Sequence, residues 1–444
     1  MVKQTLLRLS LLTITLFSCT SGTPCALKNI KPDYYVCVCN STYCDTAPSA
    51  DKISQGQYMV ISTTRNGKRF NTQVFQAGKT STTEAIYQVN TNETRQAING
   101  FGGAFTDAAG INIASLPPDA QTHLIASYFG KDGLGYTVGR VPMASCDFST
   151  HPYSYDDTPG DLNMTKFALA SEDLKYKIPF IKEAMKMSPR PIKMFGSPWS
   201  APAWMKENKN MTGKGSIIGS PGGSYYKAWA QYFVRFLQEY EKQNITFWGL
   251  TAQNEPIDGL IPNFPFQCMG YTPELYRDFI KLDLGPALED AGYGKLKLMM
   301  LDDQRLFVID WAKVVLGDPD ASKYIAGIGI HWYLDTFLPA SLLTDVHNLF
   351  PEKFIFATEA CEGSLPWQKS LPVDLGSWER GAVYASDIIN DLNNWVTGWT
   401  DWNLALDLKG GPNWVSNFVD SPILIDAGQK KFYKQPMFYI LGHF

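Results

Sequence analysis

The sequence predicts an α/β protein built around a (β/α)8 barrel, also called a TIM barrel. Eight strand-like runs alternate with amphipathic helical segments over roughly 300 residues, as this fold requires. Two of the runs lead directly into a glutamate, and the carboxyl ends of barrel strands are where such a fold places its chemistry. With 444 residues, 45% of them hydrophobic, the chain can bury one large core and support a smaller second domain.

The elements can be placed in order along the chain. Strand-like runs cover residues 99–105, 136–141, 192–195, 247–251, 296–301, 327–332, 354–357 and 398–404. Helical segments cover residues 119–128, 173–187, 225–240, 273–291, 307–316 and 380–395. A doubly wound sheet alternates similarly, but it gathers its catalytic residues at one crevice and does not spread them over strands two to eight.

The region before the barrel divides into three parts. Residues 1–22 carry a basic start, a short apolar run and small polar residues, which together predict a signal peptide. The run is too short to span a bilayer, and Cys19 fits a lipidation box poorly. Residues 23–50 form a cysteine-rich region, and residues 51–97 alternate as antiparallel strands with a tight hairpin at Asn66-Gly67. The barrel then occupies residues 98–444.

The chain has eight cysteines, four of which crowd the expected mature N-terminus. Cys25, Cys37, Cys39 and Cys44 predict two disulfides in a secreted protein, with three possible connectivities, and a zinc site is the weaker alternative. The cysteines that are isolated in sequence are expected to be buried free thiols, and they are Cys146, Cys268 and Cys361.

Several classes of function are disfavoured. The net charge is −4 with scattered basic residues, so nucleic-acid binding is not indicated. There is no H-E-x-x-H metal motif, no G-x-S-x-G nucleophile elbow and no dinucleotide fingerprint, and we expect neither a metal nor a cofactor. Five glycosylation sequons are candidates for modification in a secreted chain, at Asn40, Asn92, Asn163, Asn210 and Asn244.

Two glutamates carry the strongest functional signal. Glu255 lies in T-A-Q-N-E-P and Glu359 in F-I-F-A-T-E-A-C, each just after a strand-like run. Cleavage of a glycosidic bond needs two carboxyl groups facing one sugar, with one as proton donor and the other as nucleophile or base. We expect burial and the neighbouring negative charge to raise the pKa of the donor and to give an acidic pH optimum.

Other strand ends carry polar and aromatic residues suited to sugar hydroxyls and ring faces. For Arg140 we favour a structural role, pairing with neighbouring carboxylates. The set is Arg140 and Asp147, Ser197 to Trp199, Asn254, His331 to Tyr333, and Asp401 to Asn403.

Beside some of these residues, several longer stretches of the chain resemble the glucosylceramidases of glycoside hydrolase family 30. The stretches are GFGGAFTDAA at 100–109, RVPMASCDFS at 140–149, PFQC at 265–268, LDDQR at 301–305, GWTDWNLAL at 398–406 and GPNWV at 411–415.

The resemblance implies a retaining β-glucosidase in which Glu255 is the acid/base and Glu359 the nucleophile, acting on glucosylceramide. It implies the disulfides Cys25–Cys37 and Cys39–Cys44. It also implies a set of substrate-binding residues, which are Asp147, Trp199, Asn254, His331, Tyr333, Trp402 and Asn417.

The resemblance further implies a lysosomal setting, an anionic membrane surface and a saposin C-like activator as partners. It implies a β-sandwich domain, of which residues 51–97 are part. Because the family continues past Phe444 with further sandwich strands, we expect that domain to be incomplete here. Other possibilities are a family-30 hydrolase with a different sugar, such as a β-xylosyl or β-1,6-glucosyl substrate, and an inactive glycolipid-binding paralogue.

Two apolar segments after strands four and seven are expected at the pocket mouth, and local packing is their alternative role. The lipid-contact candidates in them are Phe264, Phe266, Leu365 and Trp367.

Overall fold

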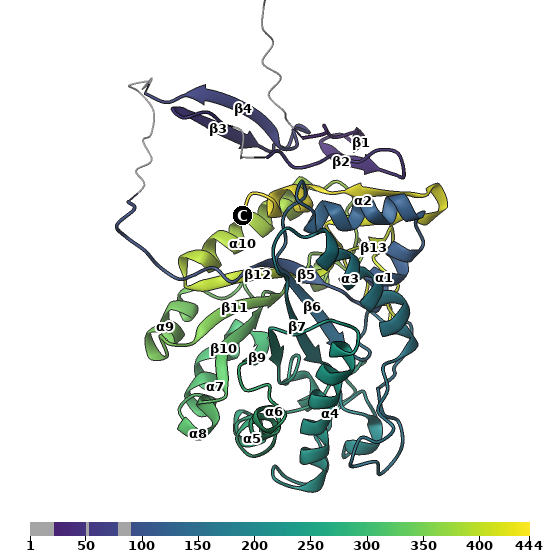
Figure 1. The fold of residues 1–444 in the computed structure, drawn as a ribbon, viewed down its shortest axis with the longest axis vertical. Coiled ribbons are helices and arrows are strands. Elements are labelled where there is room, and N and C mark those ends of the chain that lie inside the picture. Colours follow the sequence, from purple (N-terminus) through teal and green to yellow (C-terminus); the bar gives the residue numbers. More distant parts are fainter. Residues whose placement is uncertain (1–21, 50–52, 79–89) are drawn as a thin grey trace, which may run out of the picture.

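The structure, a computed structural model, describes residues 22–49, 53–78 and 90–444 (Figure 1). Residues 1–21 of the expected signal peptide, including Cys19, lie outside this part of the chain. None of the helices in the described ranges is long and apolar enough to cross a membrane.

The centre of the molecule is a closed barrel of eight parallel strands, which confirms the predicted fold class. All eight predicted strands are present, with ends that differ by a few residues from those expected. In barrel order they are β5 (Gly100–Ala104), β6 (Val138–Met143), β7 (Lys193–Pro198), β8 (Gly249–Thr251), β9 (Lys297–Gln304), β10 (Ile325–His331), β11 (Phe354–Glu359) and β12 (Val396–Asn403).

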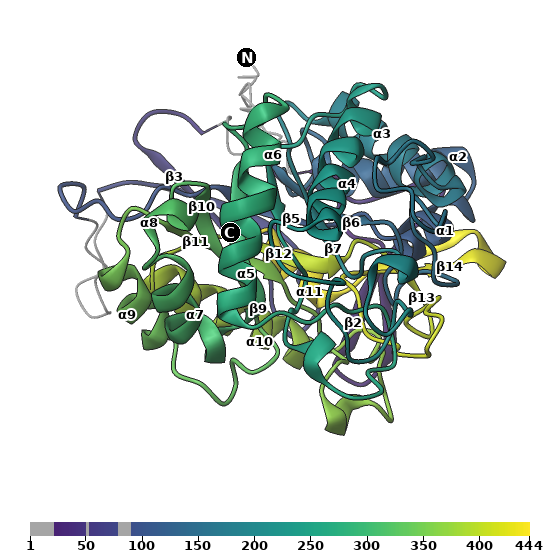
Figure 2. The ribbon, with the colours of Figure 1, turned by 90° about the horizontal axis from the view of Figure 1, so that it is seen from below.

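Helices surround the strands, as the view from below shows (Figure 2). The six predicted helical segments correspond to α2 (Pro118–Phe129), η2 with α3 (Asp173–Lys177 and Ile178–Met187), α4 (Ser224–Glu241), α5 through η5 to α6 (Pro273–Phe279, Ile280–Leu284 and Gly285–Asp290), α7 (Val308–Val315) and α10 (Trp378–Asn393). The sequence did not indicate α1 (Asp107–Ala114), α8 (Pro319–Ser322), α9 (Ser341–Leu349) or α11 (Pro436–Leu441). These helices are too short to show a clear apolar period, so packing against the rest of the protein determines where they form.

The barrel interior changes from apolar to polar along the strand direction. Val138, Phe195, Met299 and Phe356, from four different strands, form one buried apolar cluster. Side chains two residues apart on a strand point to the same side, so the next inward layer includes Arg140, two residues beyond Val138. This layer is buried and hydrogen-bonded, and it forms the floor of the site described below.

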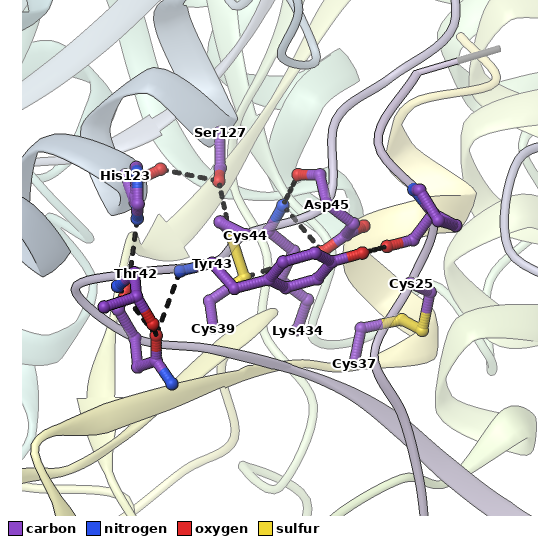
Figure 3. Close-up of a disulfide and its surroundings, with 12 residues drawn as sticks. Cys25, Cys37, Cys39, Thr42, Tyr43, Cys44, Asp45, His123, Ser127 and Lys434 are labelled. Atoms are coloured by element: carbon purple, nitrogen blue, oxygen red, sulfur yellow. Dashed lines mark hydrogen bonds and ion pairs between the residues drawn. A yellow bond between two sulfur atoms is a disulfide. The ribbon is translucent and has the colours of Figure 1, made fainter.

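A five-stranded sheet packs on one side of the barrel (Figure 1). It consists of β1 (Leu27–Lys31), β2 (Tyr34–Cys39), β15 (Lys431–Lys434), β14 (Ile423–Asp426) and β13 (Leu406–Asp407). The N-terminal region therefore pairs with strands far along the chain, which the sequence did not indicate. The disulfides Cys25–Cys37 and Cys39–Cys44 lie at this sheet, close to the buried pair of Asp45 and Lys434 (Figure 3).

A second small sheet is the hairpin of β3 (Gln57–Ser62) and β4 (Asn71–Gln76). The hairpin was predicted, and a tight turn lies at its tip: the N–H of Gly67 donates to the carbonyl of Thr64 at 3.2 Å, and the N–H of Thr64 donates to the carbonyl of Lys68 at 3.0 Å. Gly67 has a left-handed φ of 89° in this turn. The rings of Tyr58 and Phe75, which lie opposite each other on the two strands, are exposed and stack with their centroids 5.3 Å apart.

Cys146, Cys268 and Cys361 are buried free thiols, as predicted. Four sequon asparagines are exposed, and they are Asn92, Asn163, Asn210 and Asn244. Asn40 is half-buried, and its side-chain oxygen accepts hydrogen bonds from the N–H groups of Thr42 and Tyr43.

Candidate active site

A cavity of about 500 Å³ opens at the carboxyl ends of the barrel strands. Residues that follow or end five strands line its inner part: Asp147 after β6, Trp199 after β7, Glu255 after β8, Tyr333 after β10, and Glu359 at the end of β11. The cavity therefore brings together carboxylates that are about 100 residues apart in sequence.

The two glutamates lie close enough to act on one bond. A carboxylate oxygen of Glu255 and one of Glu359 lie within 4.8 Å of each other. Retaining glycosidases hold their two carboxyl groups about 5–5.5 Å apart, whereas inverting enzymes need about 6.5–9.5 Å to fit a water. The geometry is that of a retaining pair.

The backbone of Glu255 adopts a conformation that a side chain other than glycine rarely takes. Its φ is 40°, in the left-handed region, which costs on the order of 1–3 kcal/mol. Two hydrogen bonds hold the turn: the N–H of Glu255 donates to the carbonyl of Asp302 at 2.9 Å, and the N–H of Asp258 donates to the carbonyl of Glu255 at 3.0 Å. These two hydrogen bonds therefore hold the backbone turn from which the Glu255 side chain projects.

Glu359 is held by two donors on opposite sides. The hydroxyl of Tyr333 donates to Oε1 at 2.5 Å, and the guanidinium of Arg140 donates to Oε2. Arg140 also donates to Asn254 at 2.8 Å and to Asp302 at 2.9 Å. Its expected pairing with carboxylates is present, and the two carboxylates are those of Asp302 and Glu359.

Asp302 and His331 connect Glu255 to the floor of the site. His331 contacts Glu255 through Nδ1 and Asp302 through Nε2, both at 3.0 Å. Thr251 donates to Asp302 at 2.6 Å. Because both ring nitrogens face carboxylate oxygens, His331 carries both protons and is a cationic donor.

The charge of His331 follows from its surroundings. Burial by itself lowers its pKa, but the negative charges of Glu359, Asp302 and Glu255 outweigh burial and raise the pKa to about 10. Arg140 and His331 together hold the pKa of Asp302 well below its usual range, against the effect of burial.

The pKa of Glu255 moves in the direction opposite to that expected from the sequence. Burial raises the pKa of Glu359, against the lowering effect of the charges on His331 and Arg140. Burial also acts to raise the pKa of Glu255, but hydrogen bonds and charge from His331 outweigh it, so this pKa is lowered. Glu255 is therefore surrounded by groups that favour its ionised form. The sequence could not reveal this, because His331 comes from a distant strand.

One wall of the cavity carries hydrogen-bonding and aromatic groups. Asp147 accepts hydrogen bonds from Asn413 and Asn417, each at 3.0 Å. Burial raises the pKa of Asp147 to about 7, although these two amides lower it in part. The indole rings of Trp199 and Trp402 stack with their centroids 5.2 Å apart. Such a combination of carboxylate, amide and indole suits a polyhydroxylated ring.

The mouth of the cavity is apolar. Three of the four lipid-contact candidates line it: Phe266, Leu365 and Trp367. The fourth, Phe264, packs edge-on against Phe266 at 4.6 Å. Phe337, which the sequence did not single out, also lines the mouth, packs edge-on against Trp367 at 5.8 Å, and is 62% exposed.

Other predicted residues lie outside the cavity lining. Asn254 and His331 are buried beneath it and act on Arg140, Glu255 and Asp302. Trp332 lines a neighbouring cavity of about 280 Å³ and packs against Tyr384. Asp401 and Asn403 are also buried, as acceptors for Tyr384 and Thr106.

Sequence reasoning missed the residues at the end of β9. Asp302, Asp303 and Gln304 follow the fifth predicted strand, and Gln304 donates to Glu255 at 3.1 Å. All three directly follow a predicted strand, so the rule that selected Glu255 and Glu359 also selects them.

A second group of acidic residues lies beside the site. Asp335, between β10 and α9, and Asp387 and Asp391, one turn apart on α10, place carboxylate oxygens within 4.8 Å of one another. The guanidinium of Arg305 donates to Asp335 and lies 3.7 Å from each of the other two. Arg305 therefore occupies the position that a cation would take among these oxygens.

Comparisons with known proteins agree with this geometry. Residues 98–444 match the glycosyl hydrolase family 30 TIM-barrel domain. The chain is 50% identical over 424 residues to the lysosomal acid glucosylceramidase of Mus musculus, covering 95% of this chain and 82% of the relative. It is 48% identical to putative glucosylceramidase 4 of Caenorhabditis elegans, covering 95% of this chain and 80% of the relative.

A solved structure supports the same assignment. The structure of SrfJ from Salmonella typhimurium matches with a TM-score of 0.78 at 28% identity, covering 88% of this chain and 83% of that one. The barrel, the paired glutamates at its strand ends and these similarities agree, and the chain belongs to glycoside hydrolase family 30 and is a glycosidase.

Proposed function

We propose that this protein is a retaining β-glucosidase that hydrolyses glucosylceramide to glucose and ceramide. The observation that carries the proposal is the pair of Glu255 and Glu359, whose carboxylate oxygens lie within 4.8 Å in a cavity with a polar inner wall and an apolar mouth. The 50% identity to a mouse lysosomal acid glucosylceramidase supports the substrate class.

In the first step, a carboxylate oxygen of Glu359 attacks the anomeric carbon. The bond from that carbon to the ceramide oxygen breaks, and Glu255 gives its proton to the leaving oxygen. Tyr333 and Arg140, which donate to Glu359, favour its ionised form and orient it for attack. The product of this step is a glucosyl ester of Glu359.

In the second step, Glu255, now ionised, removes a proton from a water that attacks the same carbon. The ester bond to Glu359 breaks, the water oxygen remains on glucose, and Glu255 regains its proton. Two inversions at one carbon give retention of the β configuration.

The inner wall supplies sugar recognition. Asp147, held by Asn413 and Asn417, accepts hydrogen bonds from glucose hydroxyls, and Trp199 and Trp402 offer aromatic surface to the ring. A buried carboxylate that loses its hydroxyl partner is left unsatisfied, so such a site discriminates against sugars lacking that hydroxyl.

The mouth supplies lipid recognition. Phe266, Phe337, Leu365 and Trp367 form an apolar rim around the cavity opening, and it can receive the acyl or sphingoid chain of ceramide at a membrane surface. A peripheral membrane association, an anionic lipid surface, a saposin C-like activator and a lysosomal location all form part of the proposal. The similarity to the lysosomal relative supports the location, and the other three are what the family resemblance of the sequence implies.

The test is hydrolysis of glucosylceramide by the purified protein, with the anomeric configuration of released glucose followed by NMR. We expect β-glucose as the first product, and 2-fluoro-glucoside labelling should place an adduct on the peptide that contains Glu359. First release of α-glucose, or label on another carboxylate, would refute the retaining assignment. If the protein left glucosylceramide intact but cleaved β-1,6-linked glucose, its substrate would instead be a β-1,6-glucoside.

A further inference from the structure

Two of the stretches that resemble the family, PFQC at 265–268 and GPNWV at 411–415, each contribute a side chain that has no part in the mechanism above. These side chains are Gln267 and Trp414, and they contact each other beside the loop that carries Asp147. Gln267 is fully buried and lies outside the cavity lining, so it does not touch the substrate. Its amide must therefore act through its neighbours.

The amide of Gln267 uses all of its polar atoms. Its two N–H groups donate to the hydroxyl oxygen of Ser145 at 2.8 Å and to the carbonyl of Cys146 at 3.1 Å. Its oxygen accepts from the indole N–H of Trp414 at 3.0 Å. An indole N–H can only donate and a carbonyl can only accept, so these partners permit a single orientation of the amide.

These hydrogen bonds hold the backbone of Asp147 on both sides. The carbonyl of Cys146, which Gln267 binds, belongs to the peptide bond that leads into Asp147. The carbonyl of Asp147 accepts from the backbone N–H of Trp414 at 3.2 Å. Asn413, the neighbour of Trp414, donates to the Asp147 carboxylate at 3.0 Å. Gln267 therefore closes a ring of contacts that runs through Asp147 and Trp414.

Gln267 also joins this ring to the apolar mouth of the cavity. Phe266, which precedes it, lines the mouth, and Phe264 packs against Phe266. The backbone of Gln267 forms an isolated β-bridge with Thr212, which helps to hold this segment in place. Three loops, those after β6, β8 and β13, thus meet at one buried amide.

Removal of the amide would leave its partners poorly satisfied. The indole N–H of Trp414 would lose its acceptor, and the carbonyl of Cys146 would keep only the N–H of Ser149, at 3.2 Å. A polar group that loses its partner away from water is costly, and the loops can reduce the cost only by shifting. A shift on either side of Asp147 turns its carboxylate away from the sugar.

We propose that Gln267 is a positioning residue that orients the Asp147 carboxylate toward the hydroxyl groups of glucose. Sugar binding then depends on a residue that never touches the sugar. None of the hydrogen bonds of the Gln267 side chain involves Glu255 or Glu359, so the chemical steps should change little. This inference rests on the proposed glucosidase function.

The experiment compares Gln267→Met and Gln267→Glu with the unmodified protein on a soluble aryl glucoside. Methionine has a similar length but makes none of the three hydrogen bonds. We expect Gln267→Met to raise KM about tenfold and to change kcat by less than about threefold. The matched controls are Gln231→Met and Gln231→Glu, the same changes at an exposed position on α4, which should leave both constants in place.

The Gln267→Glu variant adds a dependence on pH that a purely structural role does not predict. A protonated carboxyl group can accept from Trp414 and donate to the carbonyl of Cys146, whereas an ionised one can only accept and is repelled by that carbonyl. Burial raises the pKa of such a group, so KM should be nearly normal at about pH 5 and should approach that of Gln267→Met above about pH 7. Because Asp147 titrates in every protein compared, each KM is divided by that of the unmodified protein at the same pH.

Two results in these assays would overturn the inference. One is an unchanged KM in both Gln267 variants across this pH range. The other is a fall in kcat at constant KM, since loss of folded enzyme alone gives that pattern. If Gln267→Met does not fold, the pH dependence of Gln267→Glu carries the test.

A double-mutant cycle tests whether Gln267 acts through Asp147. If it does, Gln267→Met should weaken binding much less in an Asp147→Asn background than in the unmodified protein, and additive effects would overturn the inference. The readout is calorimetric binding of phenyl β-thioglucoside, a slowly cleaved analogue, so it does not depend on turnover. Equal binding by Gln267→Met and the unmodified protein would overturn the inference alone. Absence of binding to the unmodified protein would instead refute the proposed glucose site.

Discussion

The cluster of Asp335, Asp387 and Asp391 around Arg305 makes the stability of the fold depend on pH. Three buried carboxyl groups share one guanidinium, so full ionisation would leave two uncompensated negative charges. Burial and the charge on Asp387 raise the pKa of Asp335 to about 9, although Arg305 lowers it in part. Burial, together with its two acidic neighbours, raises the pKa of Asp391 well above its usual range.

The sign and size of the effect follow from the linkage between proton binding and folding. An unfolded Asp has a pKa of about 3.9, so above that pH the folded state binds more protons than the unfolded state, and stability falls as pH rises towards about 9. Each pH unit within this window costs about 1.4 kcal/mol for each such group. From pH 5 to pH 7 one group therefore costs about 2.7 kcal/mol, a large part of a typical stability of about 5–15 kcal/mol.

The perturbation is Asp335→Asn, which keeps the shape of the protonated carboxyl group but cannot ionise. We expect little change in unfolding free energy at pH 5 and a stabilisation of about 1–3 kcal/mol at pH 7, seen as a melting temperature raised by a few °C. The assay is urea and thermal unfolding at both pH values, with Asp310→Asn, an exposed change on α7, as the control. The same loss between pH 5 and pH 7 in the variant and the unmodified protein would refute the reasoning.

Further predictions concern the active site. Glu255→Gln should lower kcat/KM about 100-fold or more for poor leaving groups and much less for activated aryl glucosides, with azide restoring part of the rate; equal losses would exclude the acid role. Tyr333→Phe removes a hydrogen bond that lowers the pKa of Glu359, so the acidic limb of the pH profile should move to higher pH, and a fixed limb would contradict this. Asp147→Asn should raise KM for glucosides about tenfold or more, and glucose analogues should inhibit the variant correspondingly more weakly. Phe337→Ser with Trp367→Ser should weaken turnover of glucosylceramide in vesicles while a soluble aryl glucoside is cleaved almost normally; parallel losses would indicate local packing instead.

The sequence by itself determined the barrel and the position of its two glutamates. Period-two and helical patterns are local, so eight strands and the main helices can be identified without knowing their neighbours. Glu255 and Glu359 follow directly from that assignment, because a residue just beyond a barrel strand faces the catalytic end whatever the rest of the chain does. The apolar segments with Phe266, Leu365 and Trp367 were found in the same way.

Only the tertiary structure decided how these groups act on one another. Pairing of β2 with β15 joins residues almost 400 positions apart, and no local pattern encodes such a partner. The same holds for the electrostatics: the pKa of Glu255 is lowered because His331 reaches it from β10. Charge interactions depend on distance and burial, which exist only once the chain is folded.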